Sequence, residues 1–209
     1  MRTLLFIIIL SAGMPALDSC SICSCKKVPC SAFEDLHFQN WFNYQPEHQL
    51  IFKNQSAYDT ITLQSIYKSE AYEASQGCYN GDVGCSQNLS IESNEIATNA
   101  KRKLSLNYFS QTPFGSSVSS KSITLWLQGF NCSANDINDQ GLVIPPGIYT
   151  GNFSPSLTIN GVVYSNVQTI TKDTTIDLSI PYPYKVYLSK GQGLVAYEIF
   201  PTHEMWVKQ

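Results

Sequence analysis

Histidines and carboxylates are the side chains of this chain best suited to acid–base chemistry, and they form no local catalytic pattern. His37, His48 and His203 lie far apart and form neither an i, i+4 metal pair nor a His-Glu-x-x-His sequence. The sequence also contains no Gly-x-Ser-x-Gly elbow, phosphate-binding loop or dinucleotide fingerprint. We therefore expect a protein that is not an enzyme and needs no cofactor. A hydrolase whose site assembles from distant residues is the alternative.

The densest group of carboxylates and amides lies around Asp136 and Asp139. Oxygen ligands of this kind suit calcium, but the spacing lacks the regular ligand positions and the terminal glutamate of an EF-hand loop. We expect a polar loop over residues 131–147 and no metal site.

A charged start, an apolar run and small residues precede Cys20. Met1-Arg2-Thr3 is followed by apolar residues from Leu4 to Leu10 and then by the helix breakers Gly13 and Pro15. This order predicts a signal peptide over residues 1–19. The run is too short for a spanning helix, which needs roughly 20 apolar residues.

The residues Leu17-Asp18-Ser19-Cys20 resemble the lipobox of Gram-negative bacterial lipoproteins. In that family the chain is cut before the cysteine, which then carries acyl chains. The resemblance implies lipidation at Cys20 and a membrane anchor. Ser21, where the family's sorting rules look for aspartate, implies the outer membrane, and the side that the protein faces stays open. The alternatives are plain secretion, with Cys20 as one more disulfide cysteine, and a retained anchor helix.

The remaining cysteines predict disulfides, because an even number of thiols in an oxidising compartment usually pairs. Cys78 and Cys85 flank a short turn-rich segment and are the first expected pair. One of the three cysteines of the tether over residues 20–30 could then reach Cys132. A zinc site in the tether is the alternative, although its spacing lacks the usual two-plus-two pattern. The disulfide candidates are Cys23, Cys25, Cys30, Cys78, Cys85 and Cys132.

Composition favours an all-β extracytoplasmic protein. The net charge is −3 and the charged fraction is 14%, so nothing indicates a nucleic-acid partner. Tyrosine, threonine, serine, asparagine, glycine and proline are frequent, as is typical of strands joined by turns. We expect a single β-rich domain over residues 31–209.

One short helix is expected at about residues 32–42. Ser31 and Glu34 fit a capping box, and Phe33, Leu36 and Trp41 give an apolar stripe that would cover the β-core.

The rest of the chain alternates in the manner of strands. The apolar positions between Asp59 and Tyr72 change parity, which predicts either a bulge or two separate strands, and Asn160-Gly161 predicts a type I′ hairpin. Met205 to Val207 is expected to form a final edge strand. Consecutive short strands with tight turns predict an antiparallel meander, forming a sandwich or a half-barrel. The expected strands cover about residues 50–52, 59–72, 88–96, 101–109, 122–130, 157–159, 162–164, 174–180, 184–188, 194–200 and 205–207.

The segment from Val186 to Tyr197 resembles the closing hairpin of small, uncharacterised β-rich lipoproteins and secreted proteins of Gram-negative bacteria. Some proteins with similar endings have half-barrel sheets like those of the lipoprotein-carrier superfamily. The leading hypothesis is therefore a lipid-anchored envelope protein with a non-catalytic binding or structural role, whose protein or small-molecule partner is unknown. A carrier of a hydrophobic ligand is the alternative. Its basis is a set of aromatic residues: Tyr164, Tyr182, Tyr184, Tyr187, Tyr197, Phe200 and Trp206.

Overall fold

The computed structural model describes residues 35–55, 57–73, 85–93, 103–112, 120–174 and 181–209, with the backbone alone at 65–73, 85 and 112. One helix, α1 (Leu36–Trp41), precedes all the strands. The strands are β1 (Gln49–Asn54), β2 (Ala57–Glu73), β3 (Cys85–Ser93), β4 (Leu104–Thr112), β5 (Ser120–Leu127), β6 (Phe130–Ala134), β7 (Asp136–Asn138), β8 (Gly141–Val143), β9 (Tyr149–Ile159), β10 (Val162–Lys172), β11 (Tyr182–Ser189), β12 (Gly193–Phe200) and β13 (Glu204–Lys208).

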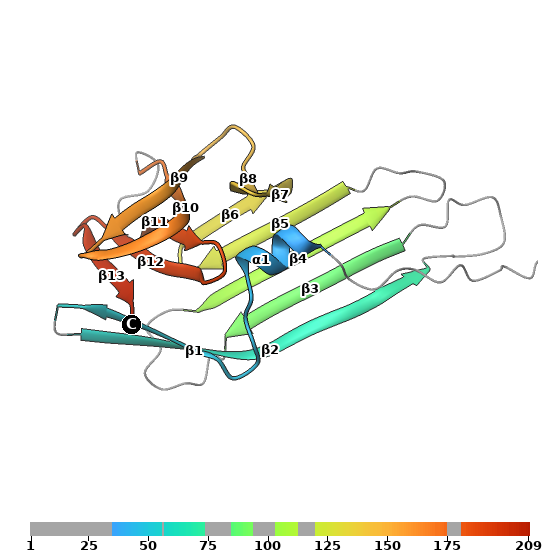
Figure 1. Ribbon diagram of the computed structural model, residues 1–209, viewed down its shortest axis with the longest axis horizontal. Coiled ribbons are helices and arrows are strands. Elements are labelled where there is room, and N and C mark those ends of the chain that lie inside the picture. The colour runs from blue at the N-terminus through green and yellow to red at the C-terminus, as the bar shows by residue number, and fades with distance from the viewer. Residues whose placement is uncertain (1–34, 56, 74–84, 94–102, 113–119, 175–180) are drawn as a thin grey trace, which may run out of the picture.

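Eleven of these strands form a single antiparallel sheet in the order β6-β5-β4-β3-β2-β1-β13-β12-β11-β10-β9. Within this sheet every pair of adjacent strands is antiparallel, and in every pair except β1–β13 the two strands follow one another in the chain. The sheet curls until it is nearly closed into a barrel (Figure 1). The predicted fold class, a mainly β meander with one short helix near the N-terminus, is confirmed.

Two local features of the backbone, a hairpin turn and a strand bulge, agree with the predictions from the sequence. Asn160 and Gly161 have φ values of 48° and 82°, the positive pair that a type I′ turn requires. The parity change in β2 corresponds to shifts of register between Leu63 and Ser65 and between Ser69 and Tyr72. The prediction of a bulge in this strand is confirmed.

The last strand is not at an edge of the sheet, so that prediction was wrong. β13 lies between β1 and β12, with Phe52 opposite Lys208 and Tyr197 opposite Trp206. It therefore joins the first half of the sheet to the second. Alternation within β13 indicates a strand, but only its long-range partners decide its place in the sheet.

The segment over residues 131–147 is also more ordered than the polar loop that we expected. It contains the end of β6 and a small hairpin of β7 and β8. The hairpin carries Ile137 and Leu142 into the core. Single apolar residues surrounded by asparagines and aspartates form too short a pattern for the sequence to predict these two strands.

The helix begins later than predicted. Asp35 is its N-cap and accepts a hydrogen bond from the Phe38 N–H at 2.9 Å. Ser31, Phe33 and Glu34 lie outside the described residues. Leu36, expected on the buried stripe, is 68% exposed, because it lies on the opposite side of α1 from the buried Phe38.

Candidate functional site

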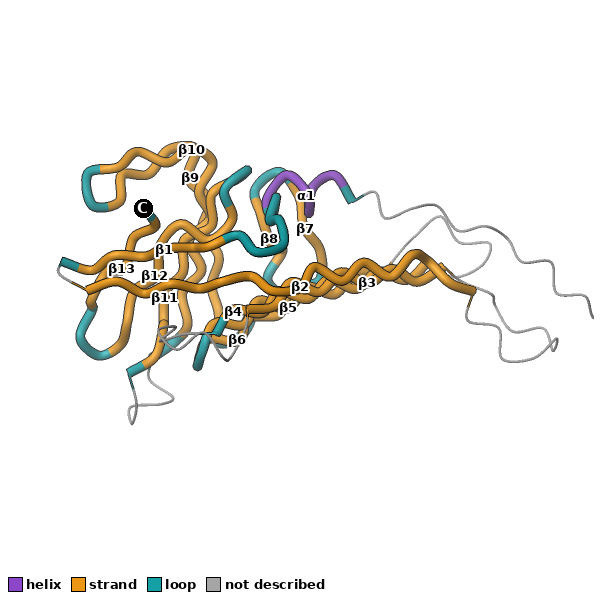
Figure 2. Tube along the Cα trace, turned by 90° about the horizontal axis from the view of Figure 1, so that it is seen from below, coloured by secondary structure: helices purple, strands orange, loops and turns teal. Residues whose placement is uncertain are grey.

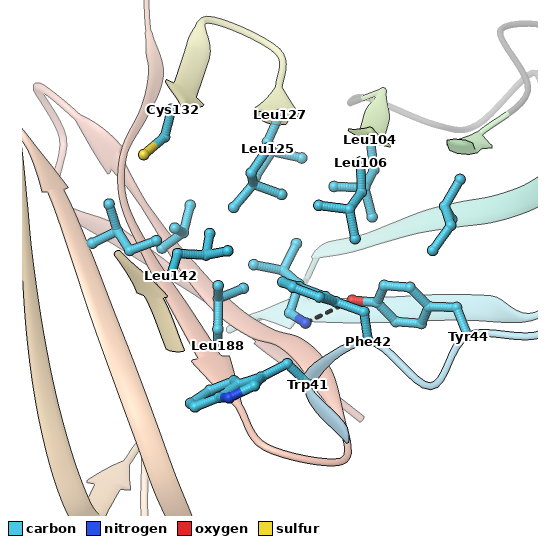
Figure 3. Packing of buried hydrophobic residues seen from close by; sticks show 14 of the residues in the cluster. Trp41, Phe42, Tyr44, Leu104, Leu106, Leu125, Leu127, Cys132, Leu142 and Leu188 are labelled. Atoms are coloured by element: carbon cyan, nitrogen blue, oxygen red, sulfur yellow. Dashed lines mark hydrogen bonds between the residues drawn. The ribbon is translucent and has the colours of Figure 1, made fainter. Parts of the chain in front are cut away.

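The concave side of the sheet is filled by side chains from α1 and the segment after it. Phe38, Trp41, Phe42 and Tyr44 are buried in the main core, and Figure 3 shows the last three lying among leucines of β4, β5, β8 and β11. The ring centroids of Phe38 and Tyr108 lie 4.9 Å apart. A buried aromatic side chain removes a large apolar area from water, so this short segment is a structural part of the core.

Charged groups fix the start of α1 to the sheet. The Lys121 ammonium lies 2.9 Å from Asp35 and 3.0 Å from Asp136. The Tyr108 hydroxyl donates to Asp35 at 2.9 Å. Burial raises the pKa of Asp35, but the bonds from Phe38, Lys121 and Tyr108 outweigh it, and the pKa lies below its usual value.

The β7–β8 hairpin closes over Trp41. The Trp41 indole N–H donates to the Asn138 carbonyl at 2.9 Å. Gln168 of β10 holds the hairpin from the other side, because its side chain accepts from the Leu142 N–H and donates to the Leu142 carbonyl. Asp139, on the same hairpin, lies 2.8 Å from the Lys190 ammonium. The carboxylates of this segment are thus partners of lysines.

A second group of titratable side chains lies on β11, β12 and the turn after β12. Glu198 accepts hydrogen bonds from Tyr184, from Tyr187 at 3.3 Å and from Lys185 at 3.1 Å. His203 Nδ1 lies 2.9 Å from the Tyr184 hydroxyl. Burial raises the pKa of Glu198, yet these donors more than offset it and the pKa is lowered. Burial, together with Glu198, raises the pKa of Tyr187 to about 12.

The lowered pKa of Glu198 predicts an acid-sensitive contribution to stability. A carboxyl group whose pKa is lower in the folded state stabilises the fold above its unfolded pKa, about 4.3 for glutamate, and this contribution is lost as the pH falls further. We expect Glu198→Gln to be less stable than wild type at pH 7 and to lose less stability between about pH 5 and pH 3. Urea unfolding at a series of pH values measures both effects.

Glu204→Gln is the control for this experiment, because Glu204 is exposed on the neighbouring strand. The control should keep the wild-type pH profile. Asp35, whose pKa is also lowered, should continue to contribute to acid sensitivity in all three proteins. Identical profiles for Glu198→Gln and wild type would contradict the assignment.

The three histidines lie in separate places. His37 approaches Asp139 at 3.6 Å, the rings of His48 and Tyr44 lie edge to face, and His203 belongs to the Glu198 group. The His203 side chain is 59% exposed, and no pattern in the sequence predicts its contact with Tyr184. In the described part of the chain, no three histidine, cysteine or carboxylate side chains are grouped so that they could hold a metal ion.

The structure describes few of the cysteines that the sequence singles out. Cys20, Cys23, Cys25, Cys30 and Cys78 lie outside the described residues, and Cys85 is described by its backbone at the start of β3. Cys132 of β6 is buried and has no disulfide partner among the described residues, and burial raises its pKa to about 12. No disulfide occurs within the described ranges, so the pairing stays a prediction.

The convex side of β3–β6 is a second candidate surface, which we call the outer polar face. Figure 2 shows this part of the sheet edge-on, with α1, β7 and β8 all on the other side of it. Within these four strands the charged residues are Glu92 and Lys121, and Lys121 points to the concave side. The outward positions are Asn88, Ser90, Glu92, Ser105, Asn107, Phe109, Gln111, Ser120, Ser122, Thr124, Trp126, Asn131 and Ser133.

A shallow groove of about 300 Å³ lies on this face. Asn88 and Ser90 of β3, Asn107 and Phe109 of β4, and Ser122 and Thr124 of β5 line it. Ser90 donates to the Asn107 amide oxygen at 2.8 Å, and the Asn107 amide donates to Ser105 at 3.0 Å. The Phe109 ring is 37% exposed. The groove therefore offers neutral hydrogen-bonding groups beside an aromatic surface.

Comparisons with family models, with curated proteins and with solved structures give no match for this chain. The described residues include no helix long and apolar enough to cross a membrane.

The outer polar face and the Glu198 group were both missed by sequence reasoning. The sequence does contain a signal for the outer polar face, because the polar positions of β3–β6 alternate with apolar ones and almost all lack charge.

Proposed function

We propose that this chain is a lipid-anchored, extracytoplasmic envelope protein with a non-catalytic binding role. Cys20 carries the anchor, placing the domain at the outer membrane, and the convex side of the sheet is the surface that binds. The Leu17-Asp18-Ser19-Cys20 sequence supports the anchor. Two or more acyl chains would hold the protein firmly, since each buried methylene contributes about 0.8 kcal/mol.

The filling of the concave side is the observation that carries the binding role. A carrier of an apolar molecule needs space inside the sheet, and ligand pockets are usually preformed. Here Trp41 and Phe38 are 0% exposed within the curl of the sheet. Tyr197 and Trp206, two of the aromatics on which the carrier hypothesis was based, stack on one another in the same core. A ligand is therefore more easily accommodated on the convex side, where the groove lies.

The nearly closed sheet of eleven strands favours one other candidate, a carrier of a hydrophobic ligand. Such a carrier would have to move α1 out of the core to admit its ligand. That movement would break the contacts of Asp35 with Lys121 and Tyr108 and expose four aromatic side chains.

Substitution of Cys20 tests the anchor. We expect the wild-type protein to fractionate with membranes and to incorporate labelled fatty acid. Cys20→Ala should lose the label and the membrane association, because no thiol remains to accept the diacylglycerol. Cys132→Ala is the matched control and should remain labelled and membrane-bound. Equal membrane association of Cys20→Ala and wild type, without label in either, would contradict the anchor.

A further inference from the structure

The outward residues of β3–β6 form rows that cross the strands. Ser90 lies opposite Asn107, Asn107 opposite Thr124, and Thr124 opposite Ser133. The neighbouring row contains Asn88, Phe109 and Ser122. Adjacent strands are about 4.8 Å apart, a spacing comparable to the length of one pyranose unit. A linear polymer lying along the row of Ser90, Asn107, Thr124 and Ser133 would meet a polar side chain at every strand.

From this surface we propose that the outer polar face binds a neutral polysaccharide chain across β3, β4 and β5. The inference rests on the proposed binding role and specifies its ligand. Hydroxyl and carboxamide groups both donate and accept hydrogen bonds, as sugar hydroxyls require. Asn107 and Thr124 provide such groups in one row of the groove, and Ser122 provides one in the next.

Phe109 supplies the apolar part of the site. Its ring is 37% exposed and lies between Asn88 and Ser122 in its row. The face of an aromatic ring carries partial negative charge, so it attracts the C–H groups on the flat side of a sugar ring. Trp126, opposite Ser105 and two rows away from Phe109, gives a second aromatic position on the face.

The charge of the face selects against anionic polymers. Nucleic acids and acidic polysaccharides bind through lysine and arginine, and the outward positions of β3–β6 contain neither. Glu92 is the one charged side chain there, and it accepts a hydrogen bond from Ser90 at 3.0 Å. This carboxylate would repel a polyanion that lay along the groove.

A protein partner fits the face less well. The cores of protein interfaces are depleted in serine, whereas serine is the commonest residue of this face. A peptide could add as a strand only at an edge of the sheet, and β3, β4 and β5 are paired on both sides. The groove is thus suited to a ligand that contacts side chains and leaves the backbone pairing intact.

Affinity electrophoresis of the full mature protein tests the proposal. The gels contain dextran, laminarin or mannan as neutral polysaccharides, and alginate or polygalacturonate as acidic ones. We expect retardation by at least one neutral polymer and none by the acidic ones. Phe109→Ala and Asn107→Ala should each weaken binding at least tenfold. Val163→Ala, at a position 69% exposed on β10 and outside the groove, should bind like wild type.

Circular dichroism confirms that each variant is folded before its binding is compared. Retardation by acidic polymers alone, by none of the polymers, or equally with and without Phe109 and Asn107 would overturn the proposal. These results would not bear on the anchor, because the Cys20→Ala experiment measures fractionation and acylation alone. A negative result for polysaccharide binding can therefore be distinguished from a negative result for the proposed function.

Discussion

Trp41→Ala is expected to lower the free energy of unfolding by about 3–5 kcal/mol, the usual cost of truncating a buried aromatic residue. The Trp41 side chain is 0% exposed, and its indole N–H donates to the Asn138 carbonyl. The substitution removes that bond and leaves a cavity between α1 and the β7–β8 hairpin. Urea denaturation followed by tyrosine fluorescence or circular dichroism measures the change.

Leu36→Ala on the same helix is the matched control. Leu36 is 68% exposed, and substitutions of exposed side chains usually change stability by less than about 0.5 kcal/mol. A loss of under about 1 kcal/mol for Trp41→Ala would mean that α1 does not fill the sheet. The carrier hypothesis would then regain its main requirement, an open interior.

The second large effect is expected at Gly193, where β12 begins. Gly193 has φ +69°, and a Cβ at this position would overlap the hydroxyl of Tyr44. That hydroxyl accepts a hydrogen bond from the buried Leu194 N–H at 2.7 Å. The left-handed backbone costs alanine roughly 1–2 kcal/mol, and losing the buried acceptor adds about 1–3 kcal/mol. Gly193→Ala should therefore destabilise the protein by roughly 2–5 kcal/mol.

Gly191→Ala separates these two causes within one hairpin turn. Gly191 has φ +85°, and nothing lies within 4 Å of the position that its Cβ would occupy. This variant should lose only the stability that the left-handed backbone costs alanine, roughly 1–2 kcal/mol. Equal losses for the two variants would contradict a close contact between the turn and Tyr44. Thermal unfolding of both proteins under the same conditions provides the comparison.

The features predicted correctly from sequence depend on neighbours along the chain. The Asn160-Gly161 turn is encoded by two adjacent residues, and alternation is local to each strand. The bulge in β2 follows in the same way from the parity of Ile61, Leu63 and Ile66. Such signals define a meander before any long-range contact is known.

The features that were missed depend on contacts between distant segments. The place of β13 is decided by pairing with β1, far away in the sequence. The β7–β8 hairpin is stabilised by Trp41 and Gln168, and its own residues give little sign of it. α1 begins at Leu36 because Asp35 meets Lys121 and Tyr108. The Glu198 group arises in the same way, from residues that converge only after the strands are paired.

Mass spectrometry of the native protein from its own envelope tests whether the protein is anchored at Cys20 and holds no ligand inside its sheet. Under non-reducing conditions we expect the mass of the chain from Cys20 to Gln209 plus covalent acyl chains, with no apolar molecule bound. A lipid or other apolar companion that is lost on unfolding, or a chain without acyl groups, would contradict this expectation.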